Sequence, residues 1–137
     1  MNVINSGNTI VDKVGTMQFS GNIIPEAWYG TVVNEKGKPN MNAIVILADV
    51  VYWYRPTEVR NEEGGKVFFK KKFSDDSFLQ RSYQQISDKM GISKRQAMSA
   101  VVSLENLGVI KRHFRTLETR QGTKISNVMF LELVPER

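Results

Sequence analysis

The segment from Ser82 to Gly108 constrains the fold of this chain more than any other stretch of its sequence. Ser82 is followed at the third position by Gln85, and Ser93 is followed in the same way by Gln96. In each pair the serine side chain can accept from the third backbone N–H of a helix, while the glutamine side chain accepts from the serine N–H. Two helices are therefore predicted to begin within this one short segment.

The turn between these two helices is short. Gly91 follows Met90 where the first helix should end, since glycine adopts the left-handed conformation of a helix end without steric cost. Ile92 then turns inward, and the second helix runs to about Leu107. Residues 82–107 are therefore predicted to form a helix-turn-helix.

The second helix has one apolar face and one small polar face. Ala97, Val101 and Leu104 recur at helical spacing and should pack on the core. The opposite face suits a DNA groove, with Arg95 and Ser99 on base edges or nearby phosphates. Gln96 stays open between reading DNA and capping Ser93. The candidate DNA contacts of this helix and its cap are Ser93, Lys94, Arg95, Gln96, Met98, Ser99 and Ser103.

Two predicted strands follow the second helix, from Val109 to Leu117 and from Lys124 to Val134, joined by a polar turn. Alternation along the first strand should turn Ile110 and Phe114 inward, with Arg112 on the same side as Ile110. Lys111, His113 and Arg115 should face outward. The hairpin is interpreted as a wing over residues 109–134. Its candidate phosphate contacts are Lys111, Arg112, Arg115, Arg120 and Lys124.

The charges of the chain are unevenly distributed. Residues 66–124 carry 13 basic and 5 acidic side chains, whereas residues 1–65 carry 5 basic and 7 acidic ones. A basic segment that coincides with a helix-turn-helix and a wing favours a polyanionic partner, double-stranded DNA above all. The predicted fold is mainly α with a small β-hairpin wing, an α+β winged helix-turn-helix.

The first half of the chain is less specific. Residues 1–22 are predicted to be a loosely ordered arm with one short strand near Thr16 to Ser20, ahead of a single domain over residues 23–135. A short helix is expected from Pro25 to about Val32. The segment from Glu58 to Lys66 is predicted to be a turn-rich connection, and Val67 to Phe73 a strand or an ordered loop.

Asn40 can cap a helix from Met41 to Tyr54, which Pro56 stops. This helix is apolar nearly all round, with Asp49 as its only charge. It must therefore be covered on more than one side, either by the segment that carries Trp28 or by a second subunit in a homodimer.

Several function classes lack support in the sequence. The chain has no cysteine and a single histidine, His113, and Asp75 with Asp76 favour a loop or a helix start over a metal site. No phosphate-binding glycine loop occurs. The expectation is a protein that is not an enzyme and that uses no cofactor and no metal. With neither a signal sequence nor an apolar run long enough for a bilayer, it is expected to be cytoplasmic, with no membrane partner.

The chain resembles the winged-helix domain at the amino terminus of phage and plasmid replication proteins, which are related to DnaD-like primosome components and replisome organisers. The resemblance covers roughly residues 23–135. It rests on the segments Ile24-Pro25-Glu26-Ala27-Trp28-Tyr29, Asn40 to Pro56 with Tyr52-Trp53-Tyr54-Arg55-Pro56, Ser82 to Gln96, and Leu104-Glu105-Asn106-Leu107-Gly108-Val109-Ile110-Lys111-Arg112.

This resemblance implies sequence-specific binding of double-stranded DNA in the initiation of replication, with a replicative helicase or its loader as a further partner. Family members carry an additional carboxy-terminal region, whereas this sequence ends at Arg137, so it is expected to be an excised domain or a protein that only binds. Two alternatives remain open. One is a transcriptional regulator that uses the same surface on an operator, and the other is a protein-interaction module of a primosome.

Overall fold

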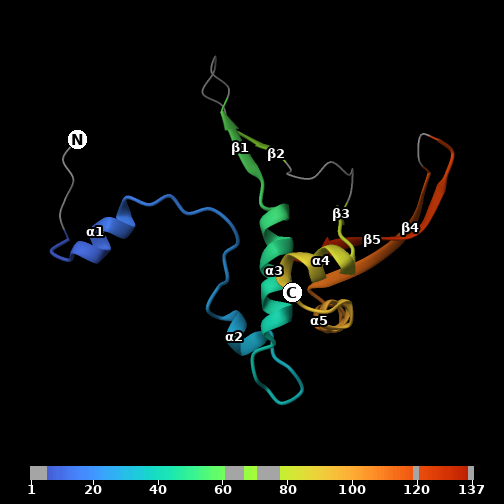
Figure 1. Ribbon diagram of the computed structural model, residues 1–137, viewed down its shortest axis with the longest axis horizontal. Coiled ribbons are helices and arrows are strands. Elements are labelled where there is room, and N and C mark those ends of the chain that lie inside the picture. The colour runs from blue at the N-terminus through green and yellow to red at the C-terminus, as the bar shows by residue number, and fades with distance from the viewer. Residues whose placement is uncertain (1–5, 61–66, 71–77, 119–120, 136–137) are drawn as a thin grey trace.

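The computed structural model describes residues 6–60, 67–70, 78–118 and 121–135, which form an α+β fold (Figure 1). The helices among these residues are α1 (Thr9–Gly15), α2 (Trp28–Thr31), α3 (Met41–Tyr54), α4 (Tyr83–Met90) and α5 (Lys94–Asn106). The strands are β1 (Thr57–Arg60), β2 (Val67–Lys70), β3 (Leu79–Gln80), β4 (Ile110–Glu118) and β5 (Lys124–Leu133).

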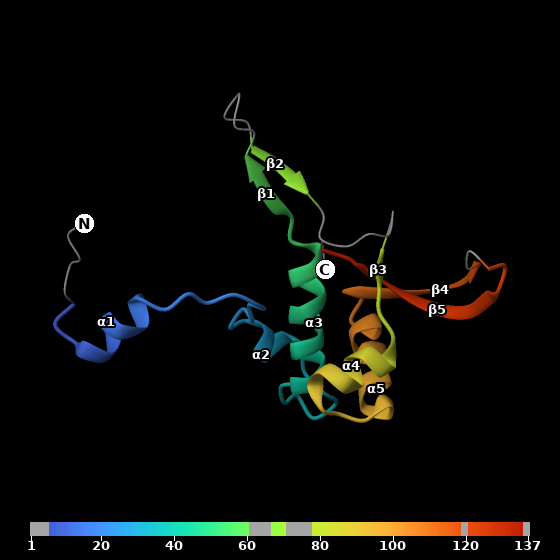
Figure 2. The same cartoon turned by 45° about the horizontal axis from the view of Figure 1, so that its top comes forward.

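The strands form two antiparallel sheets. Strands β1 and β2 make a hairpin that extends from the end of α3, and a second sheet has the order β3-β5-β4. Helix α3 stands at the centre, with α4, α5 and the three-stranded sheet on one side of it (Figure 2). The β4–β5 hairpin projects beyond these helices, and α1 lies away from the rest of the fold.

Helix α3 begins and ends as the sequence predicted. The Asn40 side chain accepts a hydrogen bond from the Ala43 N–H at 3.2 Å, and Pro56 follows the last residues of the helix. Seven of its 14 residues are buried, which is the covering that its apolar sequence required. Five of them pack in one core with residues of α4, α5 and the three-stranded sheet, namely Ala43, Ile44, Ile46, Leu47 and Val50.

Two polar side chains join α3 to its neighbours. The Tyr54 hydroxyl donates to the Leu131 carbonyl of β5 and accepts from the Leu79 N–H of β3 at 3.0 Å. Asp49 is buried and its carboxylate pairs with Lys89 of α4 at 2.6 Å and with Arg81 at 3.2 Å. Both contacts satisfy groups that would otherwise be costly to bury.

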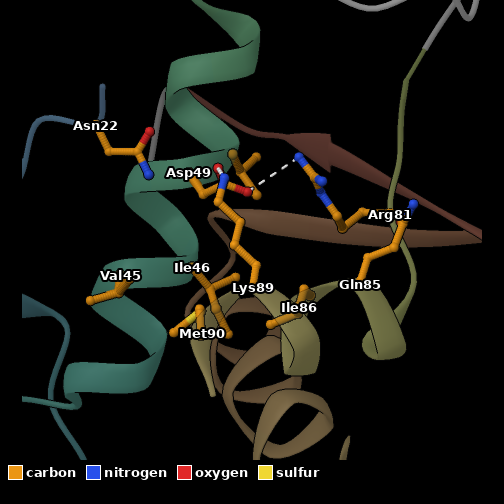
Figure 3. A pocket seen from close by; sticks show the side chains of 10 residues that line it. Asn22, Val45, Ile46, Asp49, Arg81, Gln85, Ile86, Lys89 and Met90 are labelled. Atoms are coloured by element: carbon orange, nitrogen blue, oxygen red, sulfur yellow. Dashed lines mark hydrogen bonds and ion pairs between the residues drawn. The ribbon is translucent and has the colours of Figure 1, made fainter. Parts of the chain in front are cut away.

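Figure 3 shows the surroundings of Asp49, with the Lys89 and Arg81 side chains extending toward its carboxylate. The small cavity there has a volume of about 30 Å³ and is lined by residues of α3 and α4 together with Asn22 and Arg81. It has room for no more than a water-sized molecule, and so the Asp49 cluster is structural in character.

Several local predictions are confirmed. Helices α4 and α5 start at their capping boxes, and the hairpin strands agree with the predicted strands to within two residues at each end. The helix expected from Pro25 to about Val32 is shorter, since α2 spans Trp28–Thr31. Strand β3 was not predicted, because two residues carry no periodicity that could reveal them.

Three predictions for the rest of the chain were wrong. The arm contains helix α1 and no strand at residues 16–20, because the Asn8 side chain caps that helix. The turn-rich connection begins with β1, which pairs with β2. Phe114 was expected to face inward but is 52% exposed, because the hairpin extends past the helices that would cover it.

Asp75, Asp76 and Arg120 lie outside the described residues.

We expect replacement of Asp49 by alanine to lower the free energy of unfolding by about 3 kcal/mol or more, because it leaves the largely buried Arg81 without its carboxylate. Lys89→Ala should cost about 1 kcal/mol or less, since the Lys89 side chain is 54% exposed. Urea denaturation at neutral pH measures both variants. Equal losses would contradict the assignment of Arg81 as the critical partner.

Candidate nucleic-acid interface

The start of α5 is held in place by local hydrogen bonds. The Ser93 hydroxyl accepts from the Gln96 N–H at 3.0 Å, and the Gln96 side chain accepts from the Ser93 N–H at 2.9 Å. Gly91, with φ of 70°, ends α4 in the left-handed conformation that the short turn requires. Ser93 and Gln96 therefore act as a cap that positions the first turn of α5.

Helix α5 presents a defined face to solvent. Its inner face is buried in the core through Ala97, Ala100, Val101 and Leu104. The structure brings together on the exposed side Lys94, Arg95, Met98 and Ser99, all four of which are exposed, whereas Ser103 is only half-buried farther along the helix. These predicted residues therefore lie on one continuous surface.

Arg112 has a different environment from the other predicted cations. Its Nη2 donates to Glu105 Oε1 of α5 at 2.9 Å, its backbone N–H donates to Glu105 Oε2 at 3.0 Å, and its Nη1 donates to the Tyr83 hydroxyl at 2.9 Å. These hydrogen bonds lower the pKa of Glu105 below its usual range and raise that of Arg112. Arg112 thus joins the hairpin to α4 and α5, and its donors are engaged within the protein.

The other strand cations are on the far side of the sheet. Lys111 and Arg115 alternate with Arg112, and therefore face away from the helices. The Arg115 guanidinium lies over the rings of Phe78 and Phe130, at 5.3 and 5.0 Å from their centroids. These two cations are separated by the sheet from the exposed face of α5.

His113 lies on this same far face. Its ring stacks on Phe78 with centroids 4.5 Å apart, and its Nε2 is 2.8 Å from a carboxylate oxygen of Glu132. These contacts make His113 a packing residue. Among the described residues, no group of His, Cys, Asp or Glu could hold a metal ion.

The structure adds a concave surface that the sequence did not indicate. A depression of about 310 Å³ at the start of α5 is lined by Ser82, Tyr83, Gln84, Lys94, Arg95 and Met98. A second depression of about 320 Å³ lies between α4 and the hairpin and includes Phe114 and Ile125. The two share Ser82 and Tyr83, and so a single concave face runs from α5 to the hairpin. Its shape depends on the packing angle of the helices, which no local pattern specifies.

Lys124 lies at the far end of this hairpin, where β5 begins, and pairs in register with Glu118. Arg120, in the turn between the strands, lies outside the described residues. Of the hairpin cations that the sequence singled out and the structure describes, Lys124 is therefore the one that lies at the tip.

Among the described helices, none is both long and apolar enough to cross a membrane.

Glu105→Gln is expected to reduce stability by about 1 kcal/mol at neutral pH, because the pair with Arg112 is partly exposed. The lowered pKa of Glu105 means that its contribution is present above the ordinary carboxyl pKa and is lost as the pH falls through the lowered value. Thermal unfolding should therefore differ between the variant and the unmodified chain at neutral pH and converge in acid. Glu26→Gln, at an exposed position, is the control, and a difference that persists in acid would contradict this role.

Comparisons of the chain with protein-family models, with curated proteins and with solved structures found no match. The function of the interface is accordingly inferred from its own residues and geometry.

Proposed function

We propose that this chain is a winged helix-turn-helix protein that binds double-stranded DNA, with α5 in the major groove and the β4–β5 hairpin as the wing. The observation that carries the proposal is the exposed face of α5. It gathers Lys94, Arg95, Met98 and Ser99, and Glu105, the one acidic residue of the helix, is paired with Arg112. No unpaired carboxylate of α5 therefore opposes a polyanion.

This face has the chemistry that a major groove requires. An arginine can donate two hydrogen bonds to the O6 and N7 atoms of guanine, and a serine hydroxyl can donate or accept at any base edge. Arg95 and Ser99 are one helical turn apart and both exposed, so they can address neighbouring bases. Lys94 lies in the first turn of α5, and in this proposal it contacts a phosphate.

The hairpin supports the same proposal. It projects from the side of the helix pair and is tied to it through Arg112, Glu105 and Tyr83. Lys124 is exposed near its tip, where it can contact the backbone beside the groove that α5 enters. Lys111 and Arg115, on the far face, reach phosphates only if the DNA passes that side of the hairpin.

Within this proposal, the biological role is initiation of replication of a phage, plasmid or other mobile element, with a replicative helicase or loader as partner. It rests on the segments that resemble replication proteins. An operator would present the same groove to the same face, so a transcriptional regulator is the alternative within DNA binding. The test is whether duplex from the chain's own coding neighbourhood is bound at an origin or at a promoter.

A protein-interaction module is the second candidate, and one observation favours it. Met98, Phe114 and Ile125 are exposed apolar side chains that line the concave face between α5 and the hairpin. Apolar side chains of this size are typical of a protein-binding surface. Capture of a helicase or loader together with failure to bind DNA would establish this function.

The first experiment is an anisotropy titration of the full chain against random duplex, single-stranded DNA and duplex from its coding neighbourhood, at two salt concentrations. Duplex binding should weaken with salt with a logarithmic slope of about 0.9 per neutralised phosphate. A preference for the local duplex would indicate a specific site. No binding to any duplex even at low salt would overturn the proposal.

The roles of two cations can be separated by substitution. Arg95→Ala should weaken specific binding by about 1–3 kcal/mol and leave random duplex nearly unchanged, because base contacts carry specificity. Lys124→Ala should weaken all duplexes alike and reduce the salt slope by about 1. Lys13→Ala, which removes the same charge from the distant α1, is the matched control. Equal losses on specific and random duplex in both variants would refute Arg95 as the reader of sequence.

A further inference from the structure

The arm before α2 is where exposed apolar side chains concentrate. Of the twelve large apolar side chains that are exposed among the described residues, five lie in the arm and a sixth, Ile23, directly follows it; Phe19 is 78% exposed. Figures 1 and 2 both show α1 away from the rest of the fold. The six are Ile10, Val11, Val14, Met17, Phe19 and Ile23.

Helix α1 is amphipathic, and its apolar side chains are exposed among the described residues. Ile10, Val11 and Val14 fall within an arc of about 100° on the helix, with Asp12 and Lys13 on the other side. None of its seven residues is buried, and helices of this length are marginal in water without a packing partner. Its apolar face therefore requires a surface on which to dock.

The fold offers a groove of matching character. It has a volume of about 520 Å³ and lies between α2, α3 and the ends of α5 and β5. Among the described residues that line it, none is charged and only Thr31 carries a hydroxyl, so the described lining suits an apolar helix face. It is lined by Trp28, Thr31, Val32, Leu47, Val51, Leu107, Val109, Leu133, Val134 and Pro135.

We infer that α1 of one copy docks in this groove of a second copy, so that the chain forms a dimer by exchange of its arms. The arm joins the domain at α2, whose Trp28 lines the groove, then passes α3 at Asn22 and leads away to α1. Arg55 Nη2 donates to the Gly21 carbonyl at 3.0 Å, which holds the base of the arm on this course. A two-fold axis would then let both arms reach the opposite groove, which closes the assembly.

A two-fold dimer makes this contact twice. Stable interfaces bury about 1,200–2,000 Å² in total, and two α1 helices and two grooves contribute jointly to that area. The apolar face of α1 comes from Ile10, Val11 and Val14. Leu47 and Val51 bring α3 into the contact at the groove.

Sedimentation equilibrium of the full chain tests the dimer. We expect an average mass that rises with concentration from that of one copy toward that of two. Val14→Asp should raise the dissociation constant of the dimer at least tenfold. Lys13→Asp introduces the same side chain one residue away on the polar face and should leave the dimer intact. A monomer at all concentrations, or equal effects of the two variants, would overturn the inference, and neither outcome bears on DNA binding.

Introduced cysteines test the docking partner, because the chain has none of its own. A Val14→Cys chain mixed with a Leu107→Cys chain should form a covalent heterodimer on oxidation. Absence of that product would exclude the groove. A link formed only within a chain that carries both substitutions would show that the arm folds back on its own domain, which would equally overturn exchange. Circular dichroism checks that each variant retains the fold.

Discussion

The fold depends on the burial of α3. A helix that is apolar around its whole circumference is stable in water only if other elements surround it, because each exposed apolar side chain forfeits the free energy of its burial. Helices α4 and α5 and the three-stranded sheet provide much of this cover. Its single charge, Asp49, enters the interior with two cationic partners, and its Tyr54 hydroxyl bridges two strands.

This packing decides which face of α5 meets solvent. Ala97, Val101 and Leu104 are buried against the core, which fixes the rotation of α5 about its axis. Lys94 and Arg95 therefore point outward. The cap at Ser93 fixes where the helix begins. The candidate interface is thus a consequence of the core, and its geometry is as rigid as the core itself.

The contacts of Arg112 extend that rigidity to the hairpin. Its guanidinium meets Glu105 of α5 and Tyr83 of α4, so the strand from which the hairpin projects is joined to both helices. Arg112, which the sequence analysis named as a candidate phosphate contact, therefore links the hairpin to the two helices. The other candidate cations that the structure describes lie on the α5 face, at the hairpin tip and on the far face of the sheet.

The sequence by itself determined the elements whose signals are local. The two capping boxes and Gly91 placed α4 and α5, Asn40 and Pro56 bounded α3, and alternating residues located the hairpin, because each signal acts over a few residues. Whether those elements assemble as a winged helix remains a proposal, while the α+β class follows from the elements themselves.

Only the tertiary structure decided which side chains are free to act. That Arg112 pairs with Glu105, that Phe114 is exposed and that Lys111 and Lys94 lie on different sides of the sheet all depend on contacts between distant segments. The concave face between α5 and the hairpin arises in the same way. Local patterns specify where helices and strands begin and end, but the angles at which they pack follow from the whole core, and so do the surfaces that remain exposed.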